Sequence, residues 1–77
     1  MTSKQLTNKL NTINNTNNIK VVKENGYYII KMCGYESEFC YTLKELVNEI
    51  INKETIKMTF DRWTKSGIKT TTIKGIK

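Results

Sequence analysis

The sequence has no histidine, a single aspartate and no glycine-rich phosphate loop. General acid–base and nucleophilic catalysis rely on positioned groups of these kinds, most often histidine. No serine or cysteine has a candidate base near it in the sequence. Glu36 and Glu38 alternate on a predicted strand and so share a face, but a charged face turned to solvent is the ordinary explanation of such a pair. We therefore expect a protein that is not an enzyme and that uses no cofactor.

Cysteine is scarce as well, and only Cys33 and Cys40 are present. The strand predicted between them would hold their Cα atoms roughly 20 Å apart, whereas a disulfide needs about 7 Å or less. We expect two free thiols in a reducing compartment. Without histidine or a closely spaced cysteine pair, no structural zinc site is expected.

Long apolar runs are also missing. No stretch approaches the length of a membrane span, and the N-terminal region lacks the apolar core of a signal peptide. We therefore expect a cytoplasmic protein with no membrane partner. Apolar residues make up 38% of the 77 residues, which suits one small domain with a modest stability margin.

Helical periodicity is clearest in residues 42–53. The apolar residues there fall on one side of a helix: Leu43, Leu46, Val47, Ile50 and Ile51. Thr42 and Glu45 form a capping box that marks the start of this helix. A weaker helix is predicted near the N-terminus, where Thr2 and Gln5 form a second capping box before a narrower stripe of Leu6, Leu10 and Ile13. Asparagines at positions 14–18 then end it.

Two turns predict a three-stranded meander between the helices. Asn25-Gly26 favours a type I′ hairpin that joins residues 19–24 to 27–33 and opposes Ile19 to Met32. A turn at Cys33-Gly34 leads to a third strand, residues 35–41, and opposes Tyr28 to Phe39. These registers place one set of residues on a shared inner face: Ile19, Val21, Tyr28, Ile30, Met32, Tyr35 and Phe39.

A last hairpin is predicted from residues 55–63 and 68–76. With Trp63 opposite Ile68, Lys57 faces Lys74 across the strands, and the inner face holds Ile56, Met58, Phe60 and Ile73. A bulge at Gly67 would instead turn Thr72 and Lys74 inward, which makes a poorer core.

The predicted fold class is α+β, with αβββαββ order and two helices on one face of a mainly antiparallel sheet. Residues 1–77 are expected to form a single domain. Its parts are an N-terminal helix and Asn-rich loop (1–18), a meander with the core helix (19–54) and a basic C-terminal hairpin (55–77).

The charge is concentrated at the C-terminal end. The net charge is +6, and residues 55–77 contribute five of these six units because six cations there face Asp61 alone. Such asymmetry is a signal of a partner more than of a fold.

The C-terminal hairpin therefore carries the candidate binding site: Lys57, Arg62, Trp63, Lys65, Lys69 and Lys74. Cations with threonine hydroxyls suit phosphate contacts, and a base could stack on Trp63. The structural alternative is that Trp63 covers the core edge while the lysines deter aggregation of an edge strand. For the whole patch we favour a non-catalytic accessory protein that binds nucleic acid.

The rival hypothesis is a small inhibitor or adaptor, of phage or mobile-element origin, that binds a host protein. Its interface anchors would be Tyr27, Tyr35, Tyr41 and Trp63, since aromatic residues dominate binding hot spots. A third possibility is a homodimer through an exposed strand edge of the last hairpin.

Overall fold

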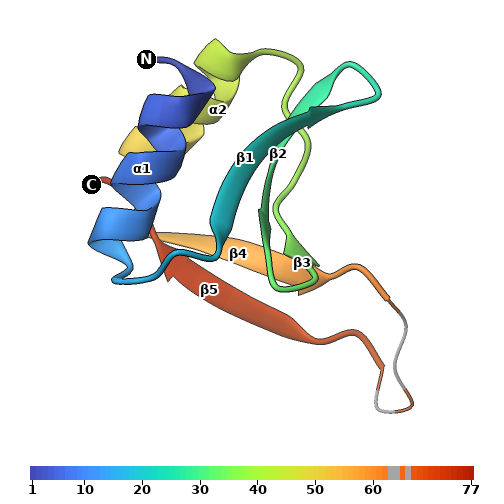
Figure 1. Cartoon of the computed structure of the whole chain (residues 1–77). Helices are drawn as coiled ribbons and strands as arrows, with labels where there is room; N and C mark the ends of the chain where they lie inside the picture. Colours follow the sequence, from blue (N-terminus) through green and yellow to red (C-terminus); the bar gives the residue numbers. More distant parts are fainter. Residues whose placement is uncertain (63–64, 66) are drawn as a thin grey trace.

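The computed structural model of the chain describes residues 1–62, 65 and 67–77. Its elements in these residues, in chain order, are α1 (Ser3–Ile13), β1 (Ile19–Glu24), β2 (Tyr27–Met32), β3 (Tyr35–Glu36), α2 (Leu43–Ile51), β4 (Thr55–Phe60) and β5 (Thr70–Lys74) (Figure 1). The strands form one antiparallel sheet in the order β1-β2-β3-β4-β5. The predicted α+β class is confirmed. Neither helix in the described part of the chain is long and apolar enough to cross a membrane.

Turn chemistry sets the register of the first three strands. Asn25 and Gly26 have φ values of 52° and 83°, and Cys33 and Gly34 have φ values of 49° and 87°. Paired positive φ values at the two central positions are those of type I′ turns, whose twist matches that of the flanking strands. The predicted pairing of Ile19 with Met32 is confirmed, and Met32 pairs with Tyr35 as expected.

The third strand departs from the prediction after two residues. The backbone of Tyr28 pairs with Cys40 rather than with Phe39, through hydrogen bonds of 2.8 and 3.0 Å. One extra residue therefore lies between Ser37 and Cys40, which makes a bulge. At this bulge the Ser37 Oγ accepts the Ile30 N–H at 2.9 Å, in place of a strand carbonyl. Cys40 consequently turns into the core, and Phe39, expected on the inner face, is 62% exposed.

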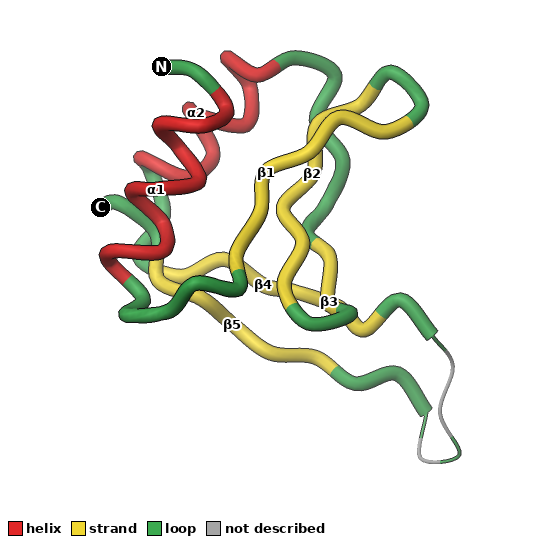
Figure 2. The backbone as a smooth tube through the Cα atoms, viewed as in Figure 1, coloured by secondary structure: helices red, strands yellow, loops and turns green. Residues whose placement is uncertain are grey.

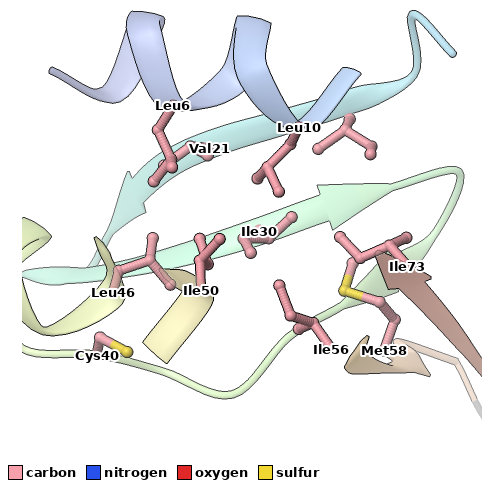
Figure 3. Close-up of a cluster of buried hydrophobic side chains, with 11 residues drawn as sticks. Leu6, Leu10, Val21, Ile30, Cys40, Leu46, Ile50, Ile56, Met58 and Ile73 are labelled. Carbon is pink, nitrogen blue, oxygen red and sulfur yellow. The ribbon is translucent and has the colours of Figure 1, made fainter. Parts of the chain in front are cut away.

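The core collects side chains from both helices and from the sheet (Figure 3). Its members are Leu6, Leu10, Ile19, Val21, Ile30, Cys40, Leu46, Ile50, Ile56, Met58 and Ile73. On α2, Leu46 and Ile50 are buried, whereas Ile51 is 40% exposed because it lies at the border of the apolar stripe. Both capping threonines, Thr2 and Thr42, accept the backbone N–H three residues on, as predicted.

Helix α1 and its C-terminal cap residue bond parts of the two outer strands of the sheet, β1 and β5. On β1, Thr7 Oγ1 accepts the Val21 N–H at 3.1 Å, and the Asn11 amide bonds both backbone groups of Ile19 at 2.9 Å. At the end of β5, the Asn14 amide accepts the Lys74 N–H at 2.7 Å and donates to the Lys74 carbonyl at 3.1 Å. The narrow apolar stripe predicted a weak helix, yet α1 bridges the first and last strands through these polar side chains.

The last hairpin pairs two residues away from the predicted register. Ile56 pairs with Ile73 and Lys57 with Thr72, so the prediction that Lys57 faces Lys74 is wrong. A slip of two residues leaves every side chain on its predicted face. Ile56, Met58 and Ile73 are accordingly buried, and the alternative with a bulge at Gly67 is excluded because Lys74 is exposed. The predicted pairing of Trp63 with Ile68 lies outside the described residues.

The chain end fixes this register by binding α2. Beyond β5, the Gly75 N–H donates to the Glu54 carbonyl at 2.8 Å, and the Ile76 N–H donates to the Ile50 carbonyl at 3.0 Å. The Gly75 bond continues the β4–β5 pairing beyond Lys74, and the Ile76 bond joins the chain end to a carbonyl at the C-terminal end of α2. Gly75 passes so close that a Cβ there would overlap the carbonyl oxygen of Lys53. Glycine is therefore required for the contact with the helix end.

Replacing Gly75 by alanine should destabilise the fold. The added methyl group meets backbone atoms that cannot move independently, so we expect a loss of about 1–3 kcal/mol. Thermal unfolding of Gly75→Ala beside Thr72→Ala, an exposed position on β5, measures the effect. Equal melting temperatures for the two variants would show that the chain end does not pack on α2 as described.

Candidate nucleic-acid interface

The sheet face turned away from the core is polar along the C-terminal hairpin. On β4 and β5, side chains alternate between the core and this outer face, which receives Thr55, Lys57, Thr59, Thr70, Thr72 and Lys74. All of these except the half-buried Thr59 are exposed. Threonine is a strand-forming residue, and its β-branched side chain keeps the hydroxyl close to the sheet surface. The result is a face on which threonine hydroxyl groups lie among the ammonium groups of Lys57 and Lys74.

Lys57 and Lys74 lie on this face as diagonal neighbours. Lys57 is opposite Thr72, and Lys74 is two positions further along β5, opposite Thr55. The two lysines are therefore not directly opposed, contrary to the prediction from the sequence, and the greater diagonal distance weakens the repulsion between their ammonium groups. On the other side, Lys57 is diagonal to Glu36, because Thr59 pairs with Glu36 across β3 and β4.

The remaining predicted cations lie toward the far end of the hairpin. Arg62, Lys65 and Lys69 are exposed, and the segments that carry them lead away from the helices (Figure 2). Lys69 is held in place by its carbonyl, which accepts the Phe60 N–H at 2.8 Å. Asp61 is fixed similarly, since its N–H donates to the Gly34 carbonyl at 2.8 Å. Trp63, the predicted stacking residue, lies outside the described residues.

Acidic side chains gather elsewhere. Five of the seven carboxylates in the chain line a groove between β4 and α2: Glu36, Glu38, Glu45, Glu49 and Asp61. Lys53, which also lines it, is paired with Glu49 at 2.7 Å, and this hydrogen bond raises the pKa of the Lys53 ammonium. The molecule thus has an acidic groove in addition to its basic hairpin. No pattern in the sequence predicted the groove.

Comparison with protein-family models, with curated proteins and with solved structures finds no match. In the described residues, no group of three or more histidine, cysteine or acidic side chains is arranged to hold a metal ion.

Exposed aromatic side chains form a second candidate surface. Tyr27 lies between Phe39 and Tyr41, with ring centroids 5.7 and 5.0 Å away. Phe39 and Tyr41 are 62% and 71% exposed. Of the predicted anchors, Tyr27 and Tyr41 are brought together, whereas Tyr35 packs edge-on against Phe60 with centroids 5.0 Å apart. Phe39 was missed because the bulge that turns it outward depends on a hydrogen bond from the neighbouring strand to Ser37.

The two cysteines are free thiols, as predicted. Cys33 is exposed at its turn, whereas Cys40 is only 8% exposed and packs in the core. Burial raises the pKa of the Cys40 thiol, and the charges of Glu49, Glu45 and Glu38 raise it further. Both effects disfavour the thiolate, which is the reactive form.

Iodoacetamide at pH 8 should therefore modify the native protein once, at Cys33, well before it reaches Cys40. In denaturant, both residues should react without prior reduction, because burial is lost. Peptide mass spectrometry over time distinguishes the two sites. Modification of Cys40 at the rate of Cys33 in the folded protein would contradict the inward turn at the bulge.

Proposed function

We propose that this chain is a non-catalytic accessory protein that binds the phosphate backbone of nucleic acid through the β4–β5 hairpin. The observation that carries the proposal is a set of five exposed cations on one hairpin: Lys57, Arg62, Lys65, Lys69 and Lys74. Asp61 is the one acid in residues 55–77. Neutralisation of phosphates by lysine and arginine supplies most of the affinity of sequence-independent binding.

The outer face of the hairpin supports phosphate contacts beyond charge alone. Thr70 and Thr72 share the outer face with Lys57 and Lys74, and threonine hydroxyls donate to phosphate oxygens in nucleic-acid complexes. The carboxylates of the groove would repel phosphate and so direct it toward the hairpin. The contacts are to the backbone, so we expect little preference for base sequence.

Fluorescence anisotropy with short single- and double-stranded oligonucleotides, measured at several salt concentrations, tests the proposal. Binding should weaken steeply with salt, with a slope of about 0.7–0.9 per phosphate contact. Oligonucleotides of unrelated sequence should bind alike. Absence of binding to either form at low salt, by folded protein, would reject the nucleic-acid function.

Protein binding is the second candidate, and the cluster of Tyr27, Phe39 and Tyr41 favours it. Exposed aromatic rings bury much apolar area at low entropic cost, which is why they serve as anchors at interfaces. A small inhibitor or adaptor that docks on a host protein would use such a cluster. Capture of a host protein by the parent, lost in Tyr41→Ser and insensitive to nuclease and to moderate salt, would support this function over nucleic-acid binding.

A further inference from the structure

The acidic groove lies where the sheet parts between β3 and β4. After Glu36 the chain leaves β4 and runs beside β2 toward α2, as the bonds between Tyr28 and Cys40 require (Figure 1). The gap left between this segment and β4 has a volume of about 850 Å³. Its floor reaches the core at Ile30, Leu46 and Ile56, and Phe39 stands at its margin.

One wall of the groove is an open strand edge. The β3–β4 pairing ends at Glu36 and Thr59, whereas β4 continues back to Thr55. Phe60 donates to Lys69, and Glu54 accepts from Gly75, so the even-numbered residues of this segment turn their backbone groups to β5. Because these directions alternate along a strand, the N–H and C=O groups of Thr55 and Lys57 point away from β5, and Lys57 lines the groove on that side. In the part of the chain that the structure describes, no strand pairs with them there.

The outer strands β1 and β5 are bonded at some of their edge positions by residues of the N-terminal segment. Asn11 satisfies the backbone of Ile19 on β1, and Asn14 satisfies that of Lys74 on β5. Unpaired strand edges are templates for another strand, and proteins usually cover them or place charges beside them. The edge at Lys57 borders a groove that has an apolar floor and charged walls.

The charge of the groove indicates what would fill it. Its five carboxylates outnumber its two ammonium groups, although the whole chain has a net charge of +6. Glu45 and Glu49 are separated by one helical turn of α2, and like charges at this spacing destabilise a helix slightly. A cationic partner would relieve that repulsion.

We propose that the groove binds an extended, lysine- or arginine-rich segment of a partner protein, which adds a strand to the open edge of β4. Backbone bonds to Thr55 and Lys57 would supply the pairing, as in other cases of strand addition. Alternate side chains of the segment would face the apolar floor and the carboxylates. This interaction uses the opposite charge to the nucleic-acid interface and shares one residue with it, Lys57, whose side chain lies on the outer face of the hairpin while its backbone lines the groove.

The test is an NMR titration of the ¹⁵N-labelled full chain with a capped heptapeptide that alternates lysine and valine. The amide signals of Thr55 and Lys57 should shift with saturation. A peptide with glutamate in place of lysine should not bind. A peptide with N-methyl groups along the pairing edge should lose most of its affinity, because it lacks the N–H donors that strand pairing needs. No shift with the basic peptide, or equal binding of the N-methylated one, would overturn the proposal.

Charge variants test the groove walls. Glu45→Gln with Glu49→Gln should raise the dissociation constant of the basic peptide about two- to thirty-fold, from two exposed ion pairs. The matched control, Glu24→Gln with Glu54→Gln, removes two carboxylates outside the groove and should have a much smaller effect. Equal weakening by both pairs would show that only net charge matters and would contradict the proposed site.

Two further outcomes decide between occupants. If the free protein dimerises and the groove amides shift on dilution, a second copy fills the groove and the partner-segment proposal is wrong. If an oligonucleotide shifts hairpin amides while the basic peptide shifts those of the groove, both surfaces bind independently. If the protein binds the basic peptide but no oligonucleotide, the nucleic-acid function is rejected and the groove proposal is retained.

Discussion

Replacing Ile50 by alanine should cost about 2–5 kcal/mol of the free energy of unfolding. Ile50 is fully buried on α2 within the cluster that joins both helices to the sheet, so truncation leaves a cavity. The same residue accepts a hydrogen bond from Ile76 through its carbonyl, which places the cavity beside the chain end. Small domains are stable by only about 5–15 kcal/mol, so this single change would remove a large share.

Ile51 provides the matched control, because it is the same residue type one position further along α2. It is 40% exposed, and we expect Ile51→Ala to destabilise the fold by well under half as much. Urea unfolding of both variants and the parent measures the difference. If the two variants unfold at the same urea concentration, the inward face of α2 is not the one described.

Neutralising the far end of the hairpin should have the largest effect on nucleic-acid binding. The triple variant Arg62→Gln, Lys65→Gln and Lys69→Gln removes three exposed cations. If each contacts a phosphate, the slope of log affinity against log salt concentration should become shallower by about 2–3. Binding at low salt should also weaken strongly. The fold should be unaffected, because these side chains are exposed.

A second triple variant separates location from net charge. Lys4→Gln, Lys9→Gln and Lys20→Gln also removes three exposed cations, but from α1 and β1. We expect its salt slope to remain close to that of the parent. Equal loss in both triple variants would mean that binding follows total charge and not the hairpin.

The sequence predicts the elements whose signals are local. Asn25-Gly26 and the capping threonines act through neighbouring backbone groups, so the first hairpin and both helix starts are confirmed. The bulge after Ser37 depends instead on the Ile30 N–H from another strand. That contact decides whether Phe39 or Cys40 faces the core, and no short-range pattern contains it.

The register of the last hairpin was beyond prediction for a related reason. A slip of two residues leaves the apolar pattern of Ile56, Met58 and Ile73 satisfied, so the alternation of side chains cannot distinguish the two pairings. The contact of Gly75 with the end of α2 distinguishes them, and it joins segments that are distant in sequence. The cations of the candidate site are concentrated in one segment, so the local composition indicates them. The acids of the groove come from segments that only the tertiary structure brings together.

The most direct test of the proposed function is an NMR titration of the ¹⁵N-labelled protein with a short oligonucleotide at low salt. The nucleic-acid proposal predicts that amide signals of the hairpin shift first, among them those of Lys69, Thr72 and Lys74, while those of Glu45 and Glu49 in the groove stay in place. Shifts confined to α1 and β1, or no shifts with the protein folded, would contradict it.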